Sequence, residues 1–247
     1  MKKQRNLLVF GLRPVTEAIQ SGKTIDRLFI QDKLKGELST ALFKLLREKK
    51  IAHTRVPPSK LNRLTRKNHQ GVVGFISPIT FCDIEILVPS LYERGEVPLL
   101  LILDRITDTR NFGALVRTAA CTGVQGIITP EKNSAPITQD AIKTSVGALF
   151  RVPIIRHPNL KVALQYLKLS GLQLIAATER ADCTVYDLDW AKPTALLLGS
   201  EENGISPAYL KMSDEVGRLP MLGPIGSLNV SVACGAILYE AVRQRLR

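Results

Sequence analysis

A continuous apolar run, a polar turn and a helical pattern follow one another in residues 99–117, which read LLLILDRITDTRNFGALVR. An uninterrupted apolar run is typical of a strand that is buried on both faces, as strands of parallel sheets are. The apolar residues after the turn recur at helical spacing and predict a helix over about 112–122. This stretch therefore predicts one strand–helix unit of an α/β domain.

The alternation of strands and helices continues to the end of the chain. The pattern predicts further strands at 126–128, 152–155, 172–176, 194–198 and 215–219, and helices at about 138–148, 160–169, 206–211 and 229–246. Such alternation favours a mostly parallel sheet. We therefore expect residues 98–247 to form an α/β domain.

A smaller α/β unit is predicted before this domain. Its expected strands are 7–10, 27–30, 51–56 and 72–76, and its expected helices are 15–20, 38–49 and a segment that begins near residue 57. We interpret residues 1–76 as one small domain. Residues 77–97 contain prolines and an excess of acidic residues, and we interpret them as a linker.

The positive charge is concentrated in the amino-terminal part. The 247 residues include 34 Lys and Arg against 22 Asp and Glu, which gives a net charge of +12. Residues 1–76 hold 17 basic and 5 acidic residues and account for +12 alone, whereas residues 98–247 hold 16 and 13 and account for +3. An excess of positive charge indicates a polyanionic partner. The two predicted domains are therefore expected to have different tasks.

The sequence lacks the patterns of metal-binding, disulfide-rich and membrane-spanning proteins. No two of the four cysteines form a CxxC pair and the three histidines have no metal-binding spacing, so we expect reduced thiols and no metal site. The apolar residues 219–242 are interrupted by Pro220, Gly223, Pro224 and Gly226, and predict a buried loop that runs into a buried helix, not a membrane span. We expect a cytoplasmic protein.

Three unusual loops follow apolar strands, at residues 104–117, 196–206 and 219–233. The common nucleotide-binding motifs GxxxxGK[ST] and GxGxxG are absent, and so is the GxSxG motif of hydrolases. Because open α/β sheets bind ligands at the carboxyl ends of their strands, these three loops form the candidate site.

The first two loops also have purely structural interpretations. Asn111 is a favoured helix-capping residue, and Arg117 would then be a surface residue. Gly199 directly after a strand lets the backbone approach another group closely, with Glu201 at the carboxyl end of that strand. The sequence Asn203–Gly204 also fits a simple tight turn. Taken one loop at a time, both interpretations stay open.

The third loop is apolar and rich in glycine, and it enters a helix for which Ser227 or Asn229 is the expected cap. Such a loop could surround an adenine ring and leave backbone groups to bond its edge. The polar residues Ser227, Asn229 and Ser231 would need partners in an otherwise apolar stretch. This favours a ligand site over a plain core loop.

Taken together and in this order, the three loops resemble the three motifs of the SpoU/TrmH family of RNA 2′-O-ribose methyltransferases, in the SPOUT superfamily. The stretches VFGLRPVTEA (residues 9–18) and HQGVVG (residues 69–74) resemble the amino-terminal RNA-binding module of this family, an L30e-like α/β fold. The resemblance covers nearly the whole chain. In layout, the chain is most similar to enzymes that modify a guanosine of 23S ribosomal RNA.

The resemblance implies a set of site residues. It implies S-adenosyl-L-methionine as the cofactor, held by Gly199, Leu219 and Leu228 with Met221 and Ser227 nearby. The positions that match the family's catalytic or RNA-positioning residues are Asn111, Arg117, Glu201, Ser227 and Asn229. The resemblance also implies a deep trefoil knot in the carboxyl-terminal part and a homodimer with the active site near its interface.

The implied reaction moves a methyl group in line from a sulfonium to a ribose 2′-oxygen. The hydroxyl is a poor nucleophile and must be polarised or deprotonated and aligned with the methyl group. The family commonly assigns this to the arginine that matches Arg117. Because a guanidinium is effectively never deprotonated in proteins, we also consider that Arg117 holds a phosphate and stabilises the developing alkoxide.

Two other functions remain possible at this point. One is a transfer RNA 2′-O-ribose methyltransferase, although many such relatives lack the separate amino-terminal module. The other is a non-catalytic RNA-binding protein on the same scaffold, which the presence of Asn111, Arg117, Glu201 and Asn229 disfavours. RNA is the expected macromolecular partner in every case, with no DNA and no membrane partner.

Overall fold

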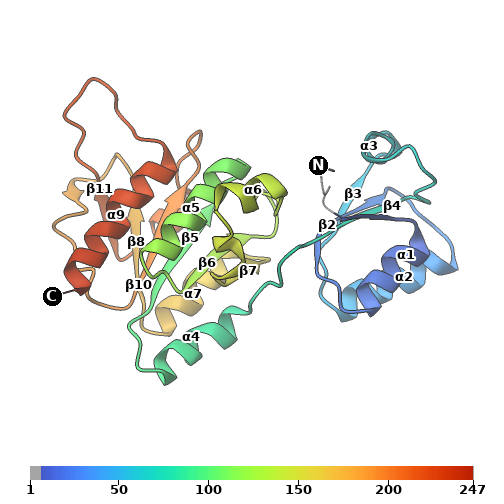
Figure 1. Ribbon diagram of the computed structural model, residues 1–247, viewed down its shortest axis with the longest axis horizontal. Helices are drawn as coiled ribbons and strands as arrows, with labels where there is room; N and C mark the ends of the chain where they lie inside the picture. The colour runs from blue at the N-terminus through green and yellow to red at the C-terminus, as the bar shows by residue number, and fades with distance from the viewer. Residues whose placement is uncertain (1–6, 247) are drawn as a thin grey trace. The chain divides into compact units, whose positions relative to one another are not determined.

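The computed structural model describes residues 7–246 and divides into two compact units (Figure 1). The first unit comprises the chain up to Thr80 together with Pro136–Gln139, and the second comprises Phe81–Ala135 and the chain from Asp140 onward. Residues 1–6 of the predicted amino-terminal domain and the last residue of the predicted carboxyl-terminal domain lie outside the described residues.

The first unit is a four-stranded sheet with helices on both faces. Its strands lie in the order β1-β4-β2-β3, with β4 antiparallel to β1 and β2, and β2 parallel to β3. Its elements are β1 (Leu7–Phe10), α1 (Leu12–Gln20), β2 (Ile25–Gln31), α2 (Glu37–Glu48), β3 (Thr54–Val56), α3 (Pro58–Leu64) and β4 (Val72–Ile76). Helices α1 and α2 cover one face, and the short α3 lies on the other (Figure 1).

The second unit is built on a seven-stranded sheet in which every pairing is parallel, which confirms the predicted α/β fold class. The strand order is β7-β6-β5-β10-β8-β11-β9. The strands are β5 (Leu99–Asp104), β6 (Gly126–Pro130), β7 (Ile154–His157), β8 (Gln173–Ala177), β9 (Cys183–Thr184), β10 (Thr194–Gly199) and β11 (Glu215–Arg218). The helices are α4 (Ile84–Glu93), α5 (Thr109–Cys121), α6 (Gln139–Thr144), the single 3-10 turn η1 (Ala148–Phe150), α7 (Leu160–Leu169), α8 (Pro207–Leu210) and α9 (Val230–Arg245).

Two central strands bring the first two candidate loops together. β5 and β10 lie side by side in a register that pairs Leu99 with Thr194 and Asp104 with Gly199. Both strands are buried almost throughout, as their apolar runs predicted. Because the strands are parallel and in register, the loops after Asp104 and Gly199 leave the same edge of the sheet at neighbouring positions. Helices α5 and α9, which follow the first and the third loop, pack against each other.

The predicted linker 77–97 differs from the structure over most of its length. Residues 84–93 form α4, whose Ile84, Leu87, Val88 and Leu91 pack into the core of the second unit. Pro89 lies inside this helix and the first turn is acidic, and these two features concealed the helical pattern. The side chain of Asp83 caps the helix by accepting a hydrogen bond from the Glu85 amide.

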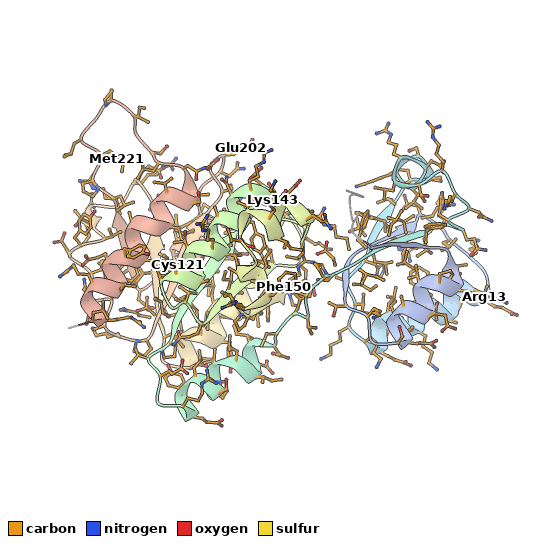
Figure 2. The ribbon with its side chains drawn as sticks, in the orientation of Figure 1. Arg13, Cys121, Lys143, Phe150, Glu202 and Met221 are labelled. Carbon is orange, nitrogen blue, oxygen red and sulfur yellow. The ribbon has the colours of Figure 1, made fainter. Side chains whose placement is uncertain are left out.

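The predicted buried loop before the last helix is wrong for residues 222–229, which are all exposed. Leu222 is completely exposed and Ile225 is 75% exposed. The loop extends away from the body of the second unit, as Figure 2 shows at Met221. The helix that follows is partly buried, through Cys234, Ile237 and Leu238 among others. No helix within residues 7–246 has the length and apolar character needed to cross a membrane.

The end of α9 is hydrogen-bonded to the segments that lead into β5 and β10, at the edge of the sheet opposite the candidate loops. The Arg245 guanidinium donates hydrogen bonds to the carbonyl oxygens of Val97, Pro98, Trp190 and Lys192, at 2.8, 3.1, 2.8 and 2.7 Å. Val97 and Pro98 precede β5, and Trp190 and Lys192 precede β10. Burial lowers the pKa of Arg245 from its ordinary value.

Replacing Arg245 with alanine is expected to destabilise the second unit. The change leaves four carbonyl oxygens without their shared donor, and hydrogen bonds to a charged group are each worth about 1.5–3 kcal/mol. We expect the free energy of unfolding to fall by about 3 kcal/mol, measured by urea denaturation. The exposed Lys211→Ala variant serves as control. A loss no larger than that of the control would contradict a structural role for Arg245.

Candidate active site and cofactor cavity

Three polar side chains from the three candidate loops meet in one hydrogen-bonded cluster. Asn111 comes from the first turn of α5, Glu201 from the loop after β10, and Asn229 from the start of α9. Asn111 Nδ2 donates to Glu201 Oε1 at 3.3 Å, and Asn229 Nδ2 donates to Asn111 Oδ1 at 3.0 Å. Residues that are 90 and 28 positions apart from Glu201 in sequence thus fix one carboxylate.

Asn111 is not the cap of α5. Asp108 caps this helix, and its Oδ1 accepts hydrogen bonds from the amides of Arg110 and Asn111 at 2.9 and 2.7 Å. The capping interpretation of Asn111 is therefore wrong. Because Asp108 satisfies the helix end, the Asn111 side chain is available to contact Glu201 and Asn229.

Asn229 performs two tasks at once. Its Oδ1 accepts hydrogen bonds from the amide and hydroxyl of Ser231, at 3.0 and 2.5 Å, so that Asn229, and not Ser227, is the cap of α9. Its Nδ2 donates to Asn111 and to Glu201 Oε1. The cap therefore also orients the cluster.

The Glu201 carboxylate is held by one of its two oxygens. Oε1 accepts from Asn111, from Asn229 at 2.5 Å, and from the Val230 amide at 3.2 Å. The amino-terminal end of α9 carries partial positive charge, which favours a carboxylate at this position. None of these three bonds uses Oε2. The second oxygen is therefore left for another partner.

The loop that carries Glu201 turns back tightly on itself. A Cβ atom on Gly199 would lie 2.1 Å from the carbonyl carbon of Gly204, far inside contact distance. The Gly204 amide donates to Ser200 O at 2.8 Å, and Gly204 has a φ of +59°. The tight turn at Asn203–Gly204 is thus confirmed. The close approach expected of Gly199 is an approach to the chain's own backbone.

An aspartate and an arginine at the end of β5 support this loop. Arg105 donates from Nε and Nη2 to the two oxygens of Asp104, each at 3.0 Å, and from Nη2 to Gly204 O at 3.1 Å. Asp104 also accepts from the Ser206 amide at 2.8 Å. The hydrogen bond to Asp104 is the main cause that raises the pKa of Arg105. Sequence reasoning missed this pair, although charged residues directly after a buried strand were a usable signal.

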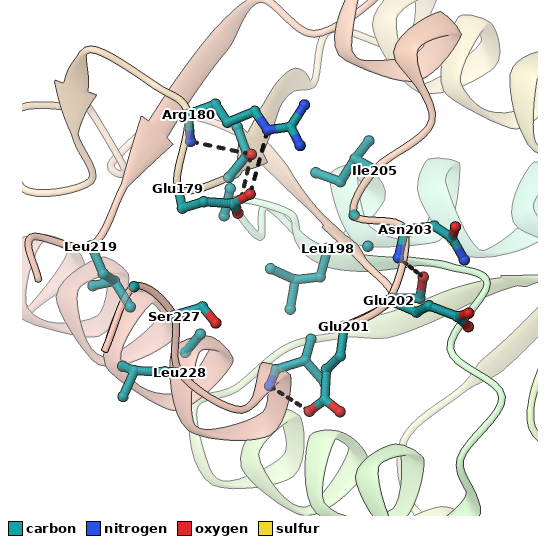
Figure 3. Close-up of a pocket in the computed structure, with 18 of the residues that line it drawn as sticks. Glu179, Arg180, Leu198, Glu201, Glu202, Asn203, Ile205, Leu219, Ser227 and Leu228 are labelled. Atoms are coloured by element: carbon teal, nitrogen blue, oxygen red, sulfur yellow. Dashed lines mark hydrogen bonds and ion pairs between the residues drawn. The ribbon is translucent and has the colours of Figure 1, made fainter. Parts of the chain in front are cut away.

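A cavity of about 680 Å³ lies between the second and third loops (Figure 3). All five residues predicted to bind the cofactor line it, and so does Glu201. These five residues are Gly199, Leu219, Met221, Ser227 and Leu228. Apolar side chains make up much of the wall, among them Leu198, Ile205 and Ile237. The volume and lining are typical of a small-molecule site.

Sequence reasoning missed a fourth segment of this cavity. Thr178, Glu179 and Arg180 follow β8 and line the cavity. Glu179 and Arg180 lie on a different part of the wall from Glu201 (Figure 3). Arg180 Nε lies 3.6 Å from Glu179 Oε1. Polar residues directly after a buried parallel strand indicate a ligand site, and this segment has them. It was missed because its sequence matches none of the motifs considered.

A second cavity of about 340 Å³ adjoins the first. Asn111, Arg105, Thr107 and Asn133 line it, and the wall that it shares with the first cavity includes Glu201. The fixed carboxylate therefore stands between two neighbouring spaces. This arrangement allows a group to pass between two molecules that bind side by side.

Arg117 is not part of the cluster. It is exposed on α5, six residues after Asn111, and it lines neither cavity. Within residues 7–246 its guanidinium makes no hydrogen bond or ion pair. The structure thus brings together Asn111, Glu201 and Asn229 but leaves the fourth predicted catalytic residue apart from them.

Replacing Asn229 with alanine is expected to weaken both the helix and the site. The change removes the cap of α9, which is worth about 1 kcal/mol, and two hydrogen bonds of the cluster. We expect that loss of stability in denaturant unfolding, together with a turnover that is reduced about tenfold or more. The Asn159→Ala variant removes the cap of α7, remote from both cavities, and should lower stability alone. Equal turnover in the two variants would contradict the role of Asn229 in the site.

Two protein-family models match this chain. The model described as the SpoU rRNA methylase family matches residues 98–239, and the model described as RNA 2′-O ribose methyltransferase substrate binding matches residues 8–82. The first match lies within the predicted domain 98–247, and the second covers most of the predicted domain 1–76 and continues into the predicted linker.

Similar proteins support the same assignment over nearly the full length. A protein of Staphylococcus saprophyticus described as a TrmH family tRNA/rRNA methyltransferase is 35% identical over 240 residues, which cover 97% of this chain and 96% of that protein. The crystal structure of the SpoU methyltransferase AviRb from Streptomyces viridochromogenes in complex with AdoMet is 28% identical, has a TM-score of 0.62, and covers 97% of this chain and 90% of that one.

A shorter relative matches about two thirds of the chain. The TrmH/SpoU tRNA modifying enzyme of A. aeolicus is 33% identical with a TM-score of 0.56, and the match covers 66% of this chain and 84% of that one. The family models, the full-length relatives and the ordered loops agree. The chain therefore belongs to the SpoU rRNA methylase family of RNA methyltransferases, as its three loops predicted.

Proposed function

We propose that this protein transfers a methyl group from S-adenosyl-L-methionine to a ribose 2′-hydroxyl of RNA, and that the target is a guanosine of 23S ribosomal RNA. The observation that carries the proposal is the Asn111–Glu201–Asn229 cluster at the wall shared by two adjoining cavities. A transfer between two bound molecules needs such an arrangement.

The larger cavity fits the proposed cofactor. S-adenosyl-L-methionine combines an apolar adenine face with a positively charged sulfonium and amino group. The cavity offers the apolar side chains of Leu198, Leu219 and Leu228, and its charged lining is acidic on balance, with Glu179, Glu201 and Glu202 against Arg180. The bound cofactor supplies an electrophilic methyl group. The chain's own residues position it and the acceptor.

The smaller cavity is the proposed place of the acceptor ribose. The cluster does not use Glu201 Oε2. This oxygen would accept a hydrogen bond from a ribose hydroxyl or from the cofactor's cationic groups. Asn111 holds the carboxylate in place through Oε1. Arg117 would hold a phosphate next to the target and stabilise the developing alkoxide, since its guanidinium stays charged.

A homodimer is proposed as the active form. Exposed apolar side chains lie on the loop 219–229 and on the outer side of α9, including Leu222, Ile225, Val232 and Tyr239. An exposed apolar patch of this kind typically marks a protein interface. A second copy of the chain, docked there, could also deliver Arg117 to a site that one chain leaves without it. The trefoil knot and the cytoplasmic location stay predictions.

The preference for ribosomal over transfer RNA rests on the separate amino-terminal domain. The A. aeolicus tRNA-modifying relative matches 66% of this chain, whereas relatives described with both substrates match nearly all of it. Transfer RNA methylation is the second candidate.

The proposed function is tested in two steps. Calorimetric titration with S-adenosyl-L-methionine should show binding, and RNA from cells that lack the protein should lose one 2′-O-methyl group at a mapped nucleotide. Loss of a transfer RNA methyl group instead would replace the ribosomal assignment. Absence of cofactor binding would favour a non-catalytic RNA-binding protein and contradict the proposal.

A further inference from the structure

The sheet of the first unit carries aromatic side chains on the face that α1 and α2 leave uncovered. Phe10 on β1, Phe75 on β4 and Phe29 on β2 belong to three strands that lie side by side. In the strand register, Phe10 and Phe29 both pair with Val73, and Phe75 lies two residues further along β4. Side chains two residues apart share one face of a strand, so all three rings project from the same side.

These rings are only half-buried. The helix on this face, α3, has seven residues, and Leu61 is its single fully buried side chain. Phe29 and Phe75 meet edge to face, with ring centroids 6.3 Å apart. The opposite face is different, because α1 and α2 bury Leu28 and Ile30 there almost completely.

Cationic side chains lie over the ring faces. Lys60 Nζ is 5.2 Å from the centroid of Phe29, and Lys67 Nζ is 5.9 Å from the centroid of Phe10. Both lysines come from α3 and the loop that follows it. A cation over a ring shows that the ring face is open to a charged group and is not covered by apolar core.

The segment that carries α3 and β4 is strongly basic. Residues 49–82 include seven Lys and Arg and no Asp or Glu. Arg63 and Arg66, on and after α3, are exposed and have no ion pair within the described residues. The α2 side also carries cations, but there they are interspersed with Glu37 and Glu48, and Lys44 pairs with Glu48 at 4.0 Å.

We propose that this aromatic face, defined by Phe10, Phe29 and Phe75, binds unpaired RNA bases by stacking, while Arg63 and Arg66 hold the adjoining phosphates. The proposal rests on RNA being the substrate, as proposed above. A base takes the place of an ammonium group on a ring, and the displaced Lys60 or Lys67 moves to a phosphate. Half-exposed rings on a four-stranded sheet, with cations around them, suit single-stranded RNA.

Duplex RNA fits this face poorly. Bases inside a duplex are stacked on each other and present no free face to a phenyl ring. A duplex would contact only the cations. The aromatic face therefore selects nucleotides in a loop or an unpaired strand, which is the form in which RNA sequence is generally read.

The test compares Phe10→Leu and Phe29→Leu with Phe43→Leu in the full-length protein. Leucine keeps the apolar contacts of these rings but cannot stack. Phe43 is a matched control, because it is a half-buried phenylalanine on α2, beside the other core cluster, with Arg55 4.9 Å from its centroid. The probes are a short oligouridylate and an RNA duplex of equal length, and affinity is measured by fluorescence anisotropy.

We expect each substitution on the aromatic face to weaken oligouridylate binding about tenfold and the Phe43 control to change it little. Duplex binding should respond to none of the three. Arg63→Ala/Arg66→Ala should weaken both probes and flatten the salt dependence, more than Lys44→Ala/Arg47→Ala does. If the arginine variant weakens binding while both phenylalanine variants bind as the unmodified protein does, the face holds phosphates only and the stacking proposal is overturned.

Two controls separate this result from misfolding and from failure of the proposed function. Thermal unfolding should show that the leucine variants stay folded. Calorimetric binding of S-adenosyl-L-methionine, which depends on the second unit, should be unchanged in all of them. A protein that binds oligouridylate through these rings but binds no cofactor would overturn the proposed function and leave the stacking site standing.

Discussion

Replacing Gly199 with alanine is expected to weaken binding of S-adenosyl-L-methionine about a hundredfold. The new Cβ would lie 2.1 Å from the Gly204 carbonyl carbon and 2.3 Å from the Ile205 nitrogen. Both atoms belong to backbone that Arg105 and Asp104 hold in place, so the loop cannot shift without loss of these hydrogen bonds. The loop must open, and the wall of the cavity opens with it.

Gly223→Ala is the matched control. Gly223 lies on the exposed loop before α9, and a Cβ atom there would meet nothing within 4 Å. Calorimetry should give nearly the unmodified affinity for Gly223→Ala. Circular dichroism should show that both variants retain the fold. If Gly199→Ala binds the cofactor normally, the cavity of about 680 Å³ is not the cofactor site.

Replacing Arg117 with alanine is expected to lower turnover about 100- to 1000-fold while cofactor binding persists. Arg117 lines neither cavity, so the loss of its side chain leaves the cofactor site intact. Removing a cation that stabilises a developing alkoxide has an effect of this size. Turnover is measured with saturating RNA, because a role in RNA affinity alone would then disappear.

Mixing two inactive variants shows which copy of the chain supplies Arg117. Glu201→Gln keeps the acceptor for Asn111 and Asn229 but removes the charge. If Arg117 acts on the site of its dimer partner, a heterodimer of Arg117→Ala and Glu201→Gln contains one intact site, and mixing restores part of the activity. If both residues serve one site within a chain, mixing restores nothing. Full activity of Arg117→Ala alone would remove this residue from the mechanism.

Much of the second unit was predictable because local pattern and buried environment agree there. The apolar runs of β5 and β10 have one good explanation, which is burial on both faces of a parallel sheet. The polar residues before the last long apolar segment narrowed its cap to Ser227 or Asn229, and Asn229 is the one that caps α9. The place of each strand in the order of the sheet depends on contacts distant in sequence, and no local pattern records it.

The errors arose where the surroundings of a residue cannot be read from the local sequence. Leu222 and Ile225 predicted burial, yet both are exposed. Asn111 looked like a cap because its contacts with Glu201 and Asn229 cross from one loop to another. Helix α4 was hidden by Pro89, although its buried face, from Ile84 to Leu91, holds four core residues. The family resemblance supplied the site residues that pattern alone could not.

The position of α9 after every strand of the sheet has a consequence for biosynthesis. The segment from Leu219 onward supplies much of the wall of the larger cavity, the Asn229 side chain and the Arg245 contacts. Because this segment follows all the strands in the sequence, it is synthesised after them. We therefore expect a nascent chain from which α9 has not yet emerged to be unable to bind cofactor, so that translation of the sheet alone does not produce a protein that modifies RNA.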